Sequence, residues 1–173
     1  VQSMAFMPVF GLNNGMIPII SYNYGAQRPD RMKRTMKLGV MVGCSIMLFC
    51  LIIMQVFPGQ ILKIFDATDD MLSMGIPAVR IMSTAFIFAG FSVTCSGMFQ
   101  AVGKGVYSMI VSMARQLFVI LPVAYFLSKA MNSVNGVWTA FPIAEIFSVI
   151  ISTFLLLRVY KKIVKPLERG QIE

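Results

Sequence analysis

Two charged residues, Arg115 and Glu145, lie deep inside long apolar blocks of this 173-residue chain. A charge at membrane depth is costly, so such a residue faces protein or water and is a functional candidate by default. Each lies about 15 to 18 Å from the same end of its block, counted at helical rise. The matched depths predict a buried ion pair. It is either structural or serves coupling through a Glu145 that changes protonation; in a further alternative, Arg115 snorkels to the membrane surface.

Adjacent amides, Asn13 and Asn14, lie in the middle of the first apolar block. Two asparagines in hydrocarbon are costly unless they face protein or water. Gly11 and Gly15 allow a close helix neighbour, and Pro18 removes a helix hydrogen bond and can kink the chain. We therefore expect this block to line a substrate cavity. The alternative is a glycine packing seam whose asparagines bond neighbouring helices.

Gln100, near the end of the third apolar block, is a weaker cavity candidate. The Ser and Thr residues before it are of a type that often bonds back to the preceding helical turn. Gly39 and Gly43 form a second GxxxG spacing, for which simple helix packing is the expected role.

Residue sets for enzyme chemistry are missing from this sequence. There is no His, and Cys44, Cys50 and Cys95 lie inside apolar runs as expected of small core residues. Phosphate-loop, nucleophile–His and metal-ligand patterns are also absent. We expect no enzyme activity, no catalytic residues, no metal and no cofactor. Any transport would draw its energy from an ion gradient.

The composition is that of a membrane protein. Apolar residues make up 57% of the chain, charged residues 13%, and the mean hydropathy is +0.77. A soluble domain has about a quarter of its residues charged. The net charge of +8 could suggest a nucleic-acid partner, but the aromatic residues lie in the apolar blocks and offer no basic stacking face. We expect a lipid bilayer as the partner and no nucleic acid.

Long apolar blocks predict an all-α polytopic membrane bundle with about five transmembrane helices. They lack the alternation typical of membrane strands. We expect one membrane domain over residues 1–173, with a short interfacial helix after Pro58 and a basic tail over 158–173. The expected spans are 1–25, 38–57, 81–103, 105–128 and 134–157.

Basic residues gather at one end of the expected bundle. Eleven follow the first, third and fifth blocks, whereas the other end has Lys63, Arg80 and Lys129. The positive-inside rule makes the first end cytoplasmic, so the C-terminus of this multi-pass plasma-membrane protein is expected there. The first helix then runs inward from Val1, with no signal peptide before it. We interpret the chain as a piece of a longer protein.

Four sequence runs resemble the multidrug and toxin extrusion (MATE) transporters, in the order of that family's last helices. The runs are GMIPIISYNYGAQRPDRMKRTMK at Gly15 to Lys37, FQAVGK from Phe99, SMARQ from Ser112 with Pro122, and GVWTAFP from Gly136. The resemblance covers nearly the whole chain. It implies helices eight to twelve of a twelve-helix transporter, so the N-terminal lobe and helix seven of the same protein are its expected partners.

The resemblance also implies a function. The chain would be a fragment of a cation-coupled efflux antiporter of a bacterial inner membrane, with Na⁺ or H⁺ as coupling ion, working by alternating access. Its substrates would be small cationic amphipathic molecules that meet aromatics and methionines. The family's last run often continues with Ser-Asp where this chain has Ala144-Glu145, which retains an acid. The implied cavity residues are Asn13, Asn14, Tyr22 and Asn23.

Two other functions stay open at this point. A lipid-linked oligosaccharide flippase-type exporter would have similar architecture but a wider, more basic cavity. A non-transporting membrane subunit would tolerate leucine at the polar positions of the first block. Some MATE members use acids in helices seven, eight and ten, whereas the first and third blocks here contain none.

Overall fold

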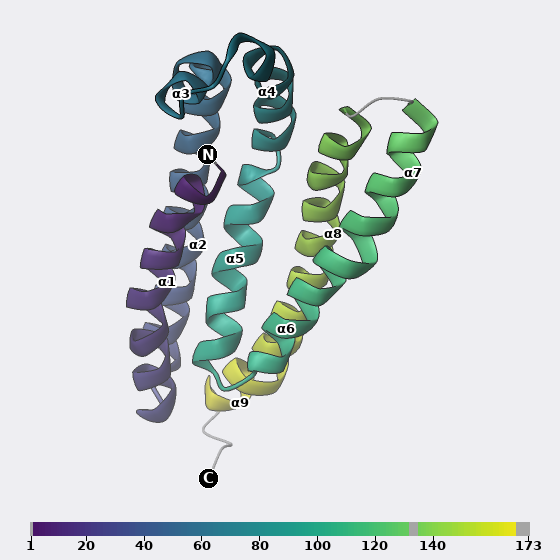
Figure 1. Cartoon of the computed structure of the whole chain (residues 1–173). Helices are drawn as coiled ribbons and strands as arrows, with labels where there is room; N and C mark the ends of the chain where they lie inside the picture. Colours follow the sequence, from purple (N-terminus) through teal and green to yellow (C-terminus); the bar gives the residue numbers. More distant parts are fainter. Residues whose placement is uncertain (1, 132–134, 169–173) are drawn as a thin grey trace.

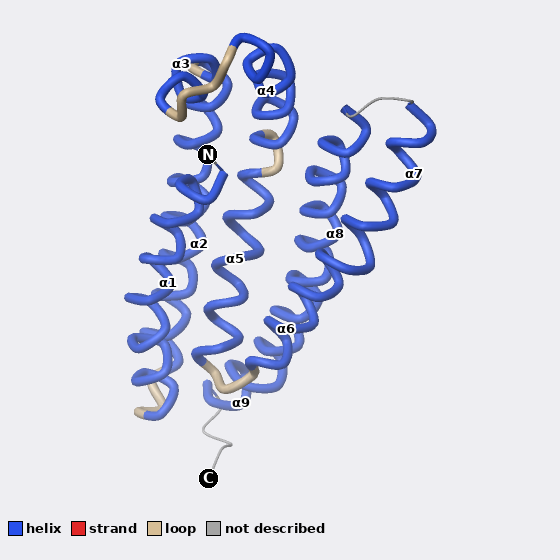
Figure 2. Tube along the Cα trace, viewed as in Figure 1, coloured by secondary structure: helices blue, strands red, loops and turns tan. Residues whose placement is uncertain are grey.

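The computed structural model describes residues 2–131 and 135–168, and its elements there are helices joined by short loops (Figure 2). The predicted all-α fold is confirmed. The longer helices are α1 (Gln2–Gly25), α2 (Pro29–Val56), α4 (Asp69–Ser83), α5 (Phe86–Ala101), α6 (Gly105–Met113), α7 (Leu121–Met131) and α8 (Asn135–Val159). The shorter pieces are α3 (Pro58–Ile64), the π-helical segments η1 (Ala114–Ile120) and η2 (Tyr160–Val164), and α9 (Lys165–Glu168).

Four of the described stretches are long and apolar enough to cross a membrane, and a fifth is a bent pair. The four are Ser3–Gly25, Pro29–Val56, Gly105–Lys129 and Gly136–Glu168. Helices α4 and α5 make a fifth span if the pair, bent by 54°, crosses as one. This is the predicted bundle of about five apolar helices.

The helix ends differ from the predicted spans at places where the prediction ended a span at the first charged residue. Helix α2 begins at Pro29 rather than at residue 38, and the predicted basic tail is helical through Glu168 by way of η2 and α9. Charged residues mark where a helix leaves hydrocarbon, but the backbone hydrogen bonds continue into the headgroup region and beyond. Residues 1, 134 and 169–173 of the predicted spans and tail lie outside the described residues.

The predicted third span, 81–103, is interrupted at Thr84 and Ala85, where α4 ends and α5 begins. The hydroxyl of Thr84 donates to the carbonyl of Ile81 at 2.6 Å. Such back-bonding competes with the helical ladder. From α2, the Gln55 side chain donates to the carbonyl of Arg80 at 2.9 Å and to the Ser83 hydroxyl at 3.0 Å. The bend is therefore held by polar groups that hydropathy alone does not register.

Helices α1, α2 and α5 pack closely against one another, and α7 and α8 lean away from them toward the end opposite α9 (Figure 1). Gly43 of α2 lies against α5: a Cβ there would lie 2.5 Å from Thr94 Oγ1. The second GxxxG is thus a packing seam, as predicted. A Cβ on Gly11 or Gly15 of α1 would have no described atom within 4 Å. Helix α1 also continues unbroken through Pro18.

Candidate functional site: a polar cavity between the helices

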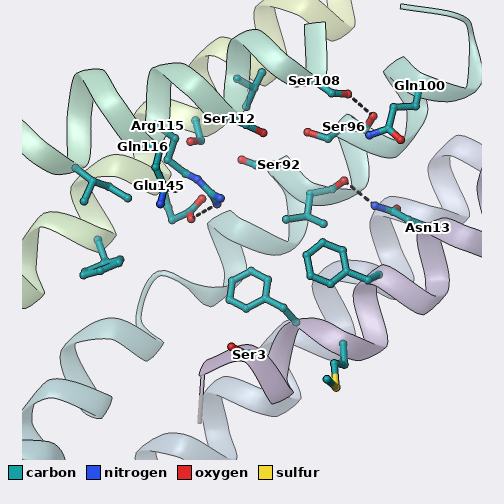
Figure 3. Close-up of a pocket in the computed structure, with 18 of the residues that line it drawn as sticks. Ser3, Asn13, Ser92, Ser96, Gln100, Ser108, Ser112, Arg115, Gln116 and Glu145 are labelled. Atoms are coloured by element: carbon teal, nitrogen blue, oxygen red, sulfur yellow. Dashed lines mark hydrogen bonds and ion pairs between the residues drawn. The ribbon is translucent and has the colours of Figure 1, made fainter. Parts of the chain in front are cut away.

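A cavity of about 680 Å³ lies between α1, α5, the α6–η1 segment and α8. Apolar and polar side chains both line it, and α1 contributes residues of both kinds (Figure 3). Its polar lining residues are Ser3, Asn13, Asn14, Ser92, Ser96, Gln100, Ser108, Ser112, Arg115, Gln116, Glu145 and Ser148. These polar residues belong to helices long and apolar enough to span a membrane, or to the bent α4–α5 pair, so the cavity lies at membrane depth.

Arg115 and Glu145 form an ion pair at the wall of this cavity (Figure 3). Arg115 Nη1 donates to Glu145 Oε1 at 2.7 Å. The side chain of Arg115 is 27% exposed and that of Glu145 is 10% exposed. A pair this buried interacts more strongly than one in water, and the charge that remains would be costly if either partner were removed.

The arginine is positioned by a local departure from α-helical geometry. Arg115 and Gln116 lie in η1, the π-helical segment between α6 and α7. Pro122 is the second residue of α7, and its missing N–H removes one hydrogen bond to the preceding turn. Single π-helical turns are uncommon and occur frequently at functional sites.

Several buried polar atoms around the cavity have no hydrogen-bond partner among the described residues. They are Asn13 Oδ1, Ser92 Oγ, Arg115 Nε, Glu145 Oε2 and Ser148 Oγ. An unpaired buried polar atom costs free energy, and native proteins rarely leave one without a partner of some kind. The residues of these five atoms all line the cavity, so its wall is more polar than its hydrogen bonds alone show.

Asn13 is both a cavity residue and a structural one. Its Nδ2 donates to the carbonyl of Val93 at 2.9 Å, which joins α1 to α5 (Figure 3). The amide lies so close to Gly97 that a Cβ there would be 2.8 Å from Asn13 Oδ1. Asn13 therefore fits both alternatives for this block, because it lines the cavity and also bonds a neighbouring helix.

The other predicted cavity residues divide into two groups. Asn14 and Gln100 are exposed and line the cavity. Tyr22 and Asn23 are not among the lining residues: Tyr22 is 73% exposed, and the buried Asn23 donates to the carbonyl of Ile19 in its own helix at 2.8 Å. These two lie near the basic end of α1, away from the ion pair.

Apart from Gln116, serines are the polar cavity residues that were not predicted from the sequence. Ser92 and Ser96 come from α5, Ser108 and Ser112 from α6, and Ser148 from α8. A signal for them exists in the sequence, because serines recur four residues apart in three separate apolar blocks, which places each pair on one helix face. Ser108 Oγ donates to the Ser96 carbonyl at 2.7 Å, so this pairing also joins α6 to α5.

A metal site built from the usual ligands has no support in the described part of the chain. It contains no group of three or more His, Cys, Asp or Glu residues that could hold a metal ion. The chemistry available at the cavity is hydrogen bonding by amides and hydroxyls together with one ion pair.

The fold and the cavity define a polytopic helical membrane protein whose polar groups gather inside the bundle. This chain belongs to the MatE family, because the MatE family model matches residues 1–126. The resemblance to MATE transporters is thereby confirmed. Its several apolar helices make the chain a multi-pass membrane protein.

Two of the curated relatives are named as a multidrug export protein and a probable multidrug resistance protein. The chain is 26% identical over 131 residues to the multidrug export protein MepA of Staphylococcus saprophyticus, covering 76% of this chain and 29% of MepA. It is 25% identical over 152 residues to the probable multidrug resistance protein YoeA of Bacillus subtilis, covering 87% of this chain and 33% of YoeA. The chain thus spans about a third or less of the length of these relatives.

Solved structures show the same fold. The chain superposes on the MATE multidrug transporter DinF-BH with a TM-score of 0.82 and 31% identity, covering 92% of this chain and 35% of that one. An inward-facing multidrug resistance MATE transporter of the MOP superfamily gives a TM-score of 0.85 at 20% identity, covering 98% of this chain and 39% of that one.

Proposed function

We propose that the chain forms helices eight to twelve of a cation-coupled multidrug efflux antiporter, driven by Na⁺ or H⁺ and working by alternating access. The observation that carries this proposal is the polar cavity between the helices at membrane depth, with an ion pair in its wall. Membership of the MatE family and the names of the multidrug export relatives support it. An N-terminal lobe and helix seven would complete the transporter.

The cavity suits small amphipathic cations. Its volume of about 680 Å³ lies within the range of drug-sized ligand sites. Phe6 and Phe10 of α1 and Phe141 of α8 supply aromatic surface, and Met7 adds an adaptable apolar contact. Ser, Asn and Gln side chains of the same lining offer hydrogen bonds that do not demand one ligand shape.

Charge in the cavity argues against a lipid-linked oligosaccharide exporter. A carrier of a diphosphate-linked lipid needs unpaired basic groups for the anionic phosphates. Arg115 is the one basic residue among the lining residues described, and Glu145 pairs with it. The described lining therefore has no unpaired positive charge to hold phosphate groups. It is better suited to organic cations that exchange with a bound ion.

The proposal also includes the membrane in which the protein lies and the side of that membrane that each end of the bundle faces. The basic segments around Arg28, Lys104 and Lys161 lie at one end of the bundle, where α1 meets α2, α5 meets α6 and η2 ends α8. Under the positive-inside rule this end faces the cytoplasm of a bacterial inner membrane, and the C-terminus lies there.

The proposal is tested by changing cavity chemistry without changing packing. Asn14 and Gln116 line the cavity and are exposed, so leucine at either position should not disturb the core. We expect Asn14→Leu and Gln116→Leu to reduce efflux of ethidium from cells expressing the native gene product by about tenfold each, with normal protein level. Asn13 is a poorer test residue because it also joins α1 to α5.

Ser45→Leu is the matched control, because Ser45 is exposed on α2, bonds within its own helix and does not line the cavity. It should leave efflux unchanged. Efflux that persists in both cavity variants would contradict the assignment of this cavity to the substrate. Efflux that is absent from the native protein under both sodium and proton gradients would favour the non-transporting subunit. Dependence on one gradient identifies the coupling ion.

A further inference from the structure

Helix α8 has two different faces along its second half. One face packs into the bundle and includes Leu155 and Val159, which are buried in a core cluster. The other face carries Ile150, Phe154 and Leu157, which are 60%, 55% and 54% exposed. Because α8 belongs to a stretch that is long and apolar enough to cross a membrane, this outward apolar face is suited to contact with lipid chains.

The outward face becomes basic where α8 ends and the C-terminal segment, η2 and α9, begins. Arg158, Lys161 and Lys165 follow Phe154 at steps of four, three and four residues, so they continue its side of the helix. Lys162 lies next to Lys161, and all four basic residues are exposed. The apolar residues of the C-terminal segment are buried in the core cluster on the opposite side. The segment is therefore amphipathic, with its basic side turned away from the bundle.

Arg158 joins the apolar part of this face to the basic part. Its guanidinium lies over the Phe154 ring, 4.7 Å from the ring centroid. An arginine near the end of a membrane helix places its apolar stem along hydrocarbon and its charge at the headgroup level. From Arg158 to Lys162 the helix rises by roughly 6 Å, which matches the thickness of the headgroup layer on one side of a bilayer. The basic residues therefore begin where the hydrocarbon ends.

The positive charge on this face is not neutralised by the described protein. Glu168 is the one acid among residues 146–168, and it forms an ion pair with Lys33 of α2. Asp30, the other described acid at this end, interacts with the charge of the same lysine. The basic residues of the α8 face form no ion pair with a described residue. A ligand that supplies negative charge would therefore complete the face.

We propose that the outward face of α8 and the C-terminal segment binds an anionic phospholipid. Its acyl chains would lie along the exposed apolar residues, and its phosphate would contact Arg158, Lys161, Lys162 and Lys165. A soluble anion would leave the apolar half uncovered, and a zwitterionic lipid brings a cation of its own to the basic half. The inference goes beyond the proposed function, because it requires a membrane around the bundle but no transport.

Lipid titration tests this site directly. The native full-length protein, in a mild non-ionic detergent, would be titrated with phosphatidylglycerol and, in a second arm, with phosphatidylcholine of the same chains. Native mass spectrometry would count the bound lipids. We expect saturable binding of phosphatidylglycerol that is tighter than that of phosphatidylcholine by about tenfold or more, since each basic residue near the headgroups adds to the attraction.

Two triple variants separate this face from net charge. Glutamine at the three lysines of the C-terminal segment should remove most of the preference for phosphatidylglycerol, whereas arginine at the same positions should retain it. The matched control removes the same charge from exposed residues at the other end of the bundle. The paired variants are Lys161→Gln/Lys162→Gln/Lys165→Gln and Lys63→Gln/Arg80→Gln/Lys129→Gln. Equal losses in the two would overturn the site, because they would reflect net charge alone.

The apolar half of the site has its own test. Phe154→Ala should weaken phosphatidylglycerol binding by about threefold, because a chain contact and the ring beneath Arg158 are both lost. Phe118→Ala is its control, because Phe118 is 73% exposed on another helical segment. Glycerol phosphate that binds as tightly as the lipid would assign the basic residues to a soluble anion and overturn the proposal.

Equal affinity of the native protein for the two lipids would also overturn it, as expected if another part of the full-length protein covers this face. Failure here and failure of the proposed function remain distinct. Lipid binding is measured without transport, and ethidium efflux is measured without added lipid.

Discussion

The Arg115–Glu145 pair shows how one contact can be energetically required without adding much stability. Taking two charges out of water offsets most of their mutual attraction. Each partner is nevertheless necessary once the other is buried, since Glu145 has 7% of its surface exposed. The pair is therefore a constraint on the fold as well as a part of the cavity wall.

At the residue scale we expect a compensating double substitution. In sodium-free buffer, Glu145→Gln or Arg115→Gln alone should lower the free energy of unfolding by about 3–5 kcal/mol, because each leaves an uncompensated buried charge. The double variant should recover much of that loss. Thermal unfolding in detergent would measure the three proteins side by side. A double variant no more stable than either single one contradicts the pairing as a source of stability.

At the scale of the helices, the contact between α2 and α5 depends on glycines, because a larger residue at these positions would have no room for its side chain. A Cβ on Gly43 would meet Thr94 Oγ1 at 2.5 Å, and a Cβ on Gly90 would meet the Gly43 carbonyl at 3.1 Å. Thr94 is fully buried and donates to the carbonyl of Gly90 at 2.7 Å, so it has little freedom to move. Since α5 also carries Ser92, this seam sets the position of one cavity wall.

At this scale the prediction compares two helical glycines. Gly43→Ala should destabilise the protein by about 1–3 kcal/mol, because the added methyl group overlaps Thr94. Gly11→Ala should be neutral or stabilising by up to about 1 kcal/mol, because alanine favours the helix and its Cβ meets no described atom. Chemical unfolding curves would measure both. Equal destabilisation would mean that the Gly11 face also has a close neighbour.

Across the whole molecule, the C-terminal helical segment closes the basic end of the bundle. Ile163, Val164 and Leu167 are buried in one core cluster with Met32 of α2 and Val102 after α5. An ion pair between Lys33 and Glu168 lies at the surface beside them. The C-terminal segment and α2 are thus joined mainly by apolar contacts, and the same end holds the cytoplasmic charge in the proposed topology.

At the scale of the molecule we expect apolar burial to outweigh the surface ion pair. Leu167→Ala should cost about 2–5 kcal/mol, as large-to-small core substitutions do. Lys33→Ala should have no measurable effect on stability, because exposed ion pairs contribute little and are screened by salt. Thermal unfolding at low and high salt would compare them. A larger loss for Lys33→Ala than for Leu167→Ala would mean that charge holds the segment in place.

Features that depend on residue type and position along the chain could be predicted from the sequence. Features that depend on contacts between helices could not. The depths of Arg115 and Glu145 followed from counting residues along two apolar blocks, and the structure places the two side chains 2.7 Å apart. Tyr22 and Asn23 followed from a family resemblance, and the structure places them outside the cavity lining. The lining serines were passed over because a hydroxyl in a membrane helix satisfies itself locally in many cases.

The sequence by itself determined that the chain is an all-α bundle of about five apolar helices with its basic residues at one end, because hydrocarbon admits only backbones that satisfy their own hydrogen bonds. It also determined which two charges share a depth. Only the tertiary structure decided which polar side chains share a cavity, where the third span bends and which oxygens lack partners. These depend on how helices rotate and pack against one another, and that rotation is set by contacts such as Gly43 with Thr94 between residues far apart in the chain.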